Sequence, residues 1–146
     1  MYFIAKQELR KMPIVGWGIK ATGMIYIDRT ERRGALESMR LAGDKAKNQG
    51  KNIVTFAEGS RSKDGTIAKF KRGAFFISKE SDLEIIPCAI KDSGKHWPLK
   101  SLKVRGGKLN IIYGKPISPR DHTEKSTEEY AVFVQKEVER LYASIQ

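Results

Sequence analysis

The chain has 146 residues, of which 40% are hydrophobic and 9% aromatic, and its 28 Lys and Arg outnumber its 17 Asp and Glu. This length suits one domain with its own core, and no apolar run approaches the roughly 20 residues of a membrane-spanning helix. The net charge of +11 indicates an anionic partner, which a phosphate ligand, an anionic lipid or a nucleic acid would satisfy.

Apolar runs and periodicity predict strands alternating with helices in the first two thirds of the chain. Strands are predicted at residues 2–5, 24–27, 53–56 and 83–90. Helical segments are predicted at residues 6–11, 13–23, 31–48 and 73–81. In residues 31–48, apolar side chains recur at spacings of three and four, which is typical of a helix with one buried face; they are Leu36, Met39, Ala42 and Ala46.

The sequence of the last third of the chain predicts a hairpin followed by a long helix. Gly106 and Gly107 separate two β-rich runs, 101–105 and 108–113, in the manner of a two-residue turn. Ser126 and Glu129 have the spacing of a capping box at the start of a helix. The buried face of that helix is predicted to hold Tyr130, Val134, Val138, Leu141 and Ile145.

These elements predict an α/β fold with one layered domain over residues 1–146. Its central sheet is expected to be largely parallel and flanked by helices, with the hairpin near the C-terminal part and the helix at the C-terminus. The only cysteine, Cys88, cannot form an internal disulfide and is predicted to be a small core residue.

The polar segment after the strand at 53–56 carries groups suited to phosphate. Arg61 can grip a phosphate with two N–H donors, Gly59 permits close approach of the backbone, and the hydroxyls of Ser60 and Ser62 can donate. Downstream, Lys69, Lys71 and Arg72 add three cations just before a predicted helix. From the residues alone, a solvated basic loop is an equally open interpretation.

Several short blocks together resemble the 1-acyl-glycerol-3-phosphate acyltransferases. Phe56-Ala-Glu-Gly-Ser-Arg-Ser62 resembles that family's Phe-Pro-Glu-Gly-Thr-Arg-Ser block, with Ala57 in place of the proline and Ser60 in place of the threonine. Gly23-Met-Ile-Tyr-Ile-Asp-Arg29 resembles its Gly-x-x-Phe-Ile-Asp-Arg block, and Ile86-Pro-Cys-Ala-Ile90 its Val-Pro-Val-Ala-Ile block. Three more segments match the family, namely Ala5-Lys-Gln-Glu-Leu9, Phe70-Lys-Arg-Gly-Ala74 and Gly114-Lys-Pro-Ile117. Together the blocks follow the family's order and cover nearly the whole chain.

The resemblance implies transfer of a fatty acyl group from a thioester to the hydroxyl of 1-acyl-glycerol-3-phosphate, which gives phosphatidic acid. The donor is acyl-CoA or acyl carrier protein, used as a co-substrate, and no resident cofactor or metal is expected. Glu58, Gly59 and Arg61, with Ser60 beside them, are expected to bind the glycerol phosphate of lysophosphatidic acid or a related lyso-lipid. Arg29 would support that site, whereas Lys69 and Lys71 are assigned to it on charge and position.

The family's general base, the histidine of a His-x-x-x-x-Asp block, has no counterpart in these 146 residues. Ser101 stands five positions after His96, and Thr127 five positions after His122, so neither histidine fits the block. No catalytic residue is therefore assigned. We expect an N-terminally truncated family domain that lacks an N-terminal strand and helix and is inactive alone, because general-base catalysis contributes about 10²–10⁴ in rate.

Three functions remain in competition at this stage. The first is an acyltransferase of phospholipid biosynthesis, peripheral on the cytoplasmic face of an anionic membrane, where Trp17 is either an interfacial anchor or a core residue. The second is a non-catalytic phospholipid-binding or regulatory pseudoenzyme of the same fold. The third, a nucleic-acid binder, rests on charge alone and is not expected, since no nucleic-acid motif is present.

Overall fold

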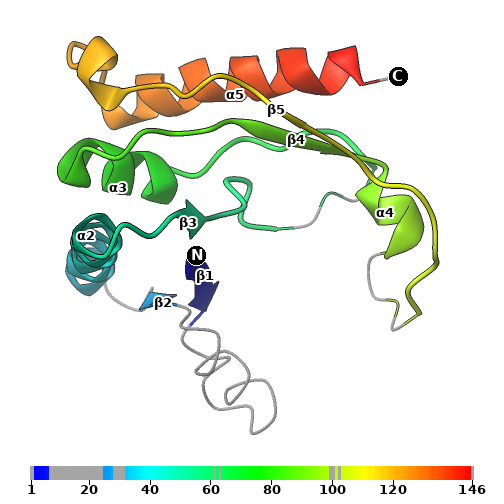
Figure 1. Ribbon diagram of the computed structural model, residues 1–146, viewed down its shortest axis with the longest axis horizontal. Coiled ribbons are helices and arrows are strands. Elements are labelled where there is room, and N and C mark those ends of the chain that lie inside the picture. The colour runs from blue at the N-terminus through cyan, green and yellow to red at the C-terminus, as the bar shows by residue number, and fades with distance from the viewer. Residues whose placement is uncertain are drawn as a thin grey trace, which may run out of the picture. The chain divides into compact units, whose positions relative to one another are not determined.

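The computed structural model describes residues 2–6, 25–27, 32–60, 62, 64–98, 101 and 103–145, in two compact units. The first unit comprises Met1–Thr55 and Gly73–Leu83, and the second Phe56–Arg72 and Glu84–Gln146 (Figure 1). Each unit combines strands with helices, so the predicted α/β class is confirmed. The single domain over residues 1–146 stays a prediction.

The first unit is built on a three-stranded parallel sheet with the order β2-β1-β3. The central strand β1 (Tyr2–Lys6) pairs with β2 (Ile25–Ile27) in the register Ile4 to Ile25. On its other side β1 pairs with β3 (Ile53–Val54), in the register Tyr2 to Ile53. The parallel pairing predicted for the first part of the chain is therefore present in this unit.

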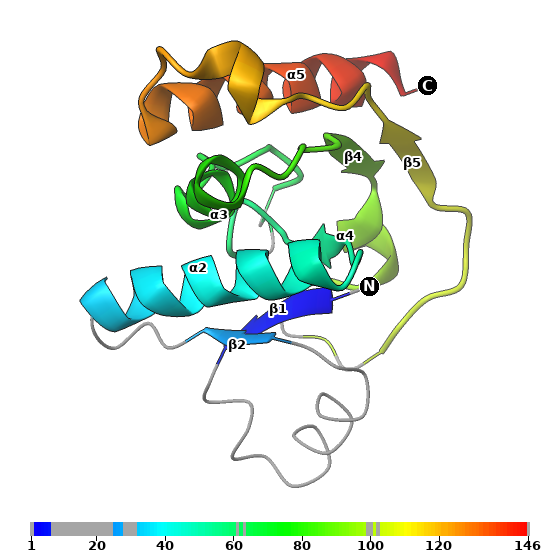
Figure 2. The ribbon, with the colours of Figure 1, turned by 60° about the vertical axis from the view of Figure 1, so that its left-hand side comes forward.

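Two helices of this unit pack closely on each other, α2 (Arg32–Asn48) and α3 (Gly73–Ser81); α2 also contacts β2 (Figure 2). Small residues of α2 form this contact: Ala42 and Ala46 are buried, and a Cβ on Gly43 would lie only 2.2 Å from Oγ of Ser81 and 2.9 Å from Cγ2 of Ile77. Glycine at position 43 therefore sets how closely the two helices approach.

The second unit is a two-stranded antiparallel sheet covered by a long helix. Strand β4 (Cys88–Lys91) pairs with β5 (Asn110–Tyr113), and an isolated bridge joins Ile85 to Ile117. The helix α5 (Thr127–Ser144) follows the short 3-10 helix η2 (Pro119–His122). The core of this unit consists of Ala89 of β4 with Val138, Leu141 and Ile145, and partly buried residues pack against it: Ile67, Phe70, Ile112 and Tyr142.

The predicted start and buried face of α5 are confirmed. The Ser126 hydroxyl accepts from the Glu129 backbone N–H at 3.2 Å, and the Glu129 carboxylate accepts from the Ser126 backbone N–H at 2.7 Å. This reciprocal pair satisfies backbone donors that the first turn would otherwise leave without partners. All five predicted apolar positions are buried: Tyr130, Val134, Val138, Leu141 and Ile145.

The predicted hairpin turn at Gly106 and Gly107 is wrong. Residues 103–109 are not strand, and β5 pairs instead with β4, which precedes the short helix α4 (Ser93–His96). The physical reason lies at Gly107, where a Cβ would sit 2.0 Å from Cε1 of His96. The glycine is needed for close contact with an imidazole ring rather than for a turn between two paired strands.

Two other strands are shorter than the sequence predicts. β3 ends at Val54, and Phe56, expected inside a buried strand, is 70% exposed. β4 begins only at Cys88, because Pro87 has no N–H to continue the ladder. Cys88 itself is half-buried rather than fully in the core, and this burial raises the pKa of its thiol.

The close contact between α2 and α3 predicts an unusual response to alanine at position 43. Gly→Ala inside a helix normally stabilises by up to about 1 kcal/mol. At Gly43 the added methyl group overlaps Ser81 and Ile77, so we expect a net destabilisation of roughly 1–3 kcal/mol in urea unfolding followed by circular dichroism. The matched control is Gly34→Ala in the same helix, where a Cβ meets nothing within 4 Å and stability should be kept or raised. Equal stability of the two variants would contradict the contact.

The capping box predicts a pH dependence of stability. Hydrogen bonds from the Ser126 backbone and hydroxyl hold the pKa of Glu129 below its ordinary value of 4.5. Its contribution is therefore complete above about pH 4.5 and is lost as the pH falls through the lowered pKa. Glu129→Gln keeps an acceptor oxygen but cannot ionise. We expect its melting temperature to lie below that of the unmodified protein at neutral pH and the gap to close in acid, whereas the exposed Glu84→Gln control should show no such gap. A gap that stays constant with pH would refute this.

Candidate functional site

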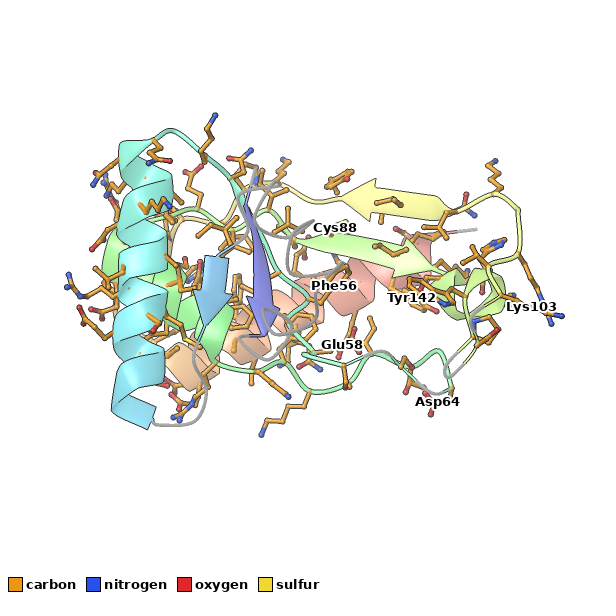
Figure 3. The ribbon with its side chains drawn as sticks, turned by 90° about the horizontal axis from the view of Figure 1, so that it is seen from below. Phe56, Glu58, Asp64, Cys88, Lys103 and Tyr142 are labelled. Carbon is orange, nitrogen blue, oxygen red and sulfur yellow. The ribbon has the colours of Figure 1, made fainter. Side chains whose placement is uncertain are left out.

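Residues 56–72, which we call the basic loop, connect β3 to α3 along the chain and belong to the second unit. Figure 3 labels Phe56, Glu58 and Asp64 on it. The loop begins with a turn in which the Gly59 N–H donates to the Phe56 carbonyl at 2.9 Å, and Gly59 has a φ of +72° that favours glycine. Its two ends are joined where the Lys71 N–H donates to the Ala57 carbonyl at 2.8 Å.

The carboxylate of Glu58 fastens the two limbs of the loop to each other. Its Oε2 accepts a hydrogen bond from the Ala68 backbone N–H at 2.8 Å, ten residues further along the chain. The half-buried Glu58 side chain thus links the turn at Gly59 to the segment that precedes Lys69. Direct binding of glycerol phosphate by Glu58 stays a prediction.

The structure brings Gly59 and Lys71 together. A Cβ on Gly59 would lie 2.8 Å from Cδ and 2.9 Å from both Cε and Nζ of Lys71, so the lysine side chain lies directly over the glycine. Within the described part of the chain, no ion pair engages Lys69 or Lys71, and both are exposed. Ser60, the next residue after Gly59, is exposed as well.

Other charged and polar groups of the loop are engaged within the protein. Asp64 accepts hydrogen bonds from the hydroxyl and backbone N–H of Thr66 and from the Ser62 hydroxyl, and these bonds, led by the Thr66 hydroxyl, lower its pKa. The Ser62 hydroxyl, which the sequence offered as a donor to phosphate, is thus used by Asp64. Arg72 forms an ion pair with Glu128.

Helix α5 holds the basic loop through two side chains that sequence reasoning missed. Gln135 Oε1 accepts from the Phe70 backbone N–H at 2.9 Å, and the Tyr142 hydroxyl donates to the Gly65 carbonyl at 3.2 Å. The partners are 65 and 77 residues apart in sequence, so no local pattern could have paired them. The sequence offered one indication for Tyr142: it lies four residues after Val138, a predicted apolar position of α5, and so falls near the buried face of that helix.

The remaining predicted site residues are placed as follows. Arg29 and Arg61 lie outside the described residues. His96 lies in α4 with its Nε2 3.1 Å from the Lys108 carbonyl oxygen, and the His122 ring packs 4.4 Å from the Phe133 ring. Both histidines are therefore engaged in contacts that hold their own segments.

Among the described residues, none of the helices has both the length and the apolar composition that crossing a bilayer requires. The same part of the chain contains no group of three His, Cys, Asp or Glu side chains arranged to hold a metal ion.

Comparison with known proteins assigns this chain to a family. Residues 1–91 match the model of the family described as Acyltransferase. A 1-acyl-sn-glycerol-3-phosphate acyltransferase of Helicobacter pylori is 30% identical over 141 residues, which cover 96% of this chain and 59% of that protein. One from Chlamydomonas reinhardtii is 31% identical over 124 residues, covering 84% of this chain and 37% of that protein.

A solved structure shows the same similarity. The crystal structure of the 1-acyl-sn-glycerophosphate (LPA) acyltransferase PlsC from Thermotoga maritima matches with a TM-score of 0.76 and 29% sequence identity, over 97% of this chain and 55% of that one. The chain thus spans about one third to three fifths of the length of the relatives it matches. The resemblance found in the sequence blocks is confirmed, and the chain belongs to the acyltransferase family.

Proposed function

We propose that this protein acts in phospholipid biosynthesis as a 1-acylglycerol-3-phosphate O-acyltransferase, and that its basic loop binds the phosphate of the acceptor. In this reaction the acceptor hydroxyl oxygen attacks the thioester carbonyl carbon of acyl-CoA or acyl carrier protein. A C–O ester bond forms, the C–S bond breaks, and the hydroxyl proton passes to a base and then to the leaving thiolate. The product is phosphatidic acid, and the thioester donor is the only co-substrate.

The observation that carries this proposal is the position of Lys71 over Gly59. The left-handed turn at Gly59, which has no Cβ, lets the Lys71 side chain lie against it, and the Lys71 ammonium supplies the charge that a phosphate dianion needs. Lys69 adds a second cation from the same limb of the loop. Arg61 follows Ser60 directly in sequence, and Arg29 completes the set by family resemblance.

Glu58 supports the site in this proposal by holding the loop in shape. The Ala68 N–H points at its carboxylate, and that bond keeps the limb carrying Lys69 and Lys71 close to the turn at Gly59. Preorganising the cations in this way lowers the ordering cost of binding the phosphate. The proposed role of Glu58 is therefore positioning as much as direct contact.

A specific observation favours a second candidate function. The block that the resemblance assigns to phosphate is present in the sequence, whereas neither His96 nor His122 matches the His-x-x-x-x-Asp pattern of the family's base. A phospholipid-binding or regulatory pseudoenzyme of the same fold would show this combination. In both cases the proposed location is the cytoplasmic face of an anionic membrane, which the net charge of +11 supports.

The proposed phosphate site predicts that this chain binds sn-glycerol 3-phosphate and that Lys71→Ala weakens the binding. Loss of one charge-assisted contact to phosphate should reduce affinity by about tenfold or more in titration calorimetry. Lys136→Ala, which removes an exposed lysine from α5, should leave affinity unchanged. Equal affinities for the two variants would remove Lys71 from the site.

A pair of glycine variants separates the Lys71 contact from backbone strain. Gly59 and Gly65 both have positive φ, at +72° and +86°, but a Cβ on Gly65 meets nothing within 4 Å. Gly59→Ala is therefore expected to weaken glycerol 3-phosphate binding more than Gly65→Ala, because it alone displaces the lysine.

Because neither His96 nor His122 matches the family's base pattern, we expect substrate binding and turnover to separate in these 146 residues. Supplied with lysophosphatidic acid and acyl-CoA, the 146-residue chain is expected to form no phosphatidic acid above the uncatalysed background while it retains glycerol 3-phosphate binding. Lipid products can be followed by mass spectrometry. If the chain does form phosphatidic acid, and His96→Ala or His122→Ala abolishes that activity, the substituted histidine is a base within this chain and the expectation is wrong.

A further inference from the structure

The connection between β4 and β5 is unusual in its charge. The connection, residues 92–109, contains a single acid, Asp92, which forms an ion pair with Lys95, and it contains five Lys and Arg: Lys95, Lys100, Lys103, Arg105 and Lys108. This excess of positive charge indicates an anionic partner.

Residues 103–109 of this connection fold back onto the short helix α4. The Arg105 N–H donates to the His96 carbonyl at 2.8 Å, and the His96 ring nitrogen lies 3.1 Å from the Lys108 carbonyl oxygen. Close contact of the ring with Gly107 completes the attachment. Residues 103–109, with three of the cations, therefore lie beside α4 at one end of the β4–β5 sheet (Figure 1), and Lys103 is labelled there in Figure 3.

Apolar side chains are exposed between these cations. Trp97 is 52% exposed, Val104 68% and Leu109 40%, and strand β5 continues the apolar exposure with Ile111 and Tyr113. Lys103, Arg105 and Lys108 are exposed too, and within the part of the chain that the structure describes no ion pair engages them. We call these six residues the α4 surface: Trp97, Lys103, Val104, Arg105, Lys108 and Leu109.

The chemistry of the α4 surface fits a lipid bilayer better than other polyanions. A nucleic acid or an acidic protein would meet the cations, but neither requires exposed Val104 and Leu109 beside them. The indole N–H of Trp97 already donates to the Ser101 carbonyl at 2.8 Å. Its ring can therefore enter an apolar layer without leaving a buried donor unsatisfied, which would otherwise cost free energy.

We propose that the α4 surface is the membrane-docking face of this protein, with Trp97, Val104 and Leu109 inserted at the level of the lipid headgroups of an anionic bilayer and Lys103, Arg105 and Lys108 on the lipid phosphates. This inference rests on the proposed function in one respect: docking would bring the basic loop to an acceptor that resides in the membrane. The docking itself requires no catalysis and no bound substrate.

The test is flotation of the 146-residue chain with phosphatidylcholine vesicles prepared with and without phosphatidylglycerol, in the absence of lysophosphatidic acid. Binding is expected only with the anionic lipid and should weaken with added salt. Lys103→Gln combined with Arg105→Gln should weaken binding on the order of twentyfold, since each cation near an anionic surface contributes about fivefold. Val104→Gln should weaken it on the order of fivefold by removing inserted apolar area.

Matched variants elsewhere in the chain provide the controls. Lys51→Gln combined with Lys136→Gln removes two exposed cations outside the α4 surface, and Val132→Gln replaces an exposed valine of α5. These variants should float like the unmodified chain apart from a small general effect of net charge, and circular dichroism melts should show that every variant is folded.

Two outcomes would overturn the proposal. One is equal loss of flotation in the α4-surface and control variants, which would mean that net charge alone drives binding. The other is tight binding to DNA or an acidic protein without binding to vesicles, which would assign the surface to another partner. Because glycerol 3-phosphate titration needs no vesicle, failure of docking with that binding intact would leave the proposed function standing.

Discussion

The packing of α5 on the inner face of β4 and β5 is the contact on which the candidate site depends. Val138 and Leu141 bury their side chains against Ala89, and Ile67 and Phe70 of the basic loop join the same core. The helix that closes this core therefore also holds the loop, through Gln135 at the Phe70 N–H and Tyr142 at the Gly65 carbonyl. Leaving the partly buried Phe70 N–H without an acceptor would cost free energy, so its bond to Gln135 favours one conformation of the loop.

Within that loop, hydrogen bonds and an ion pair engage some charged side chains and leave others without an ion-pair partner among the described residues. Asp64 is surrounded by donors of its own turn, Glu58 receives the Ala68 N–H, and Arg72 is paired with Glu128. The negative groups are thereby occupied locally, whereas Lys71 lies over the backbone of Gly59. In the proposed site, a dianionic phosphate would meet the Lys71 ammonium at this turn without having to displace a carboxylate from it.

The sequence predicted what local patterns determine and missed what distant contacts determine. The capping box at Ser126 and the apolar positions of α5 follow from helical spacing alone, and both are present. The hairpin at Gly106 and Gly107 failed because a glycine pair does not reveal whether it serves a turn or, as here, a close contact with His96. The sequence placed Gly59 and Lys71 in one polar loop, as the structure does. It did not reveal that the two residues are in contact, because that contact depends on the bond from the Lys71 N–H to the Ala57 carbonyl. Gln135 and Tyr142 could not be found because their partners are distant in the chain.

Membership of the acyltransferase family and the geometry of the basic loop concern different steps of the proposed reaction. Holding the acceptor phosphate orients the attacking hydroxyl, and orientation contributes whether or not a base is present. Removing the proton is a separate task, worth about 10²–10⁴ in rate, and it requires a group within hydrogen-bond reach of that hydroxyl. In this chain His96 is bound to the Lys108 carbonyl and His122 packs against Phe133, so each ring is already used to hold its own segment. The two proposed functions therefore invoke the same ligand and the same loop, and they differ in whether a proton acceptor is supplied to the bound hydroxyl.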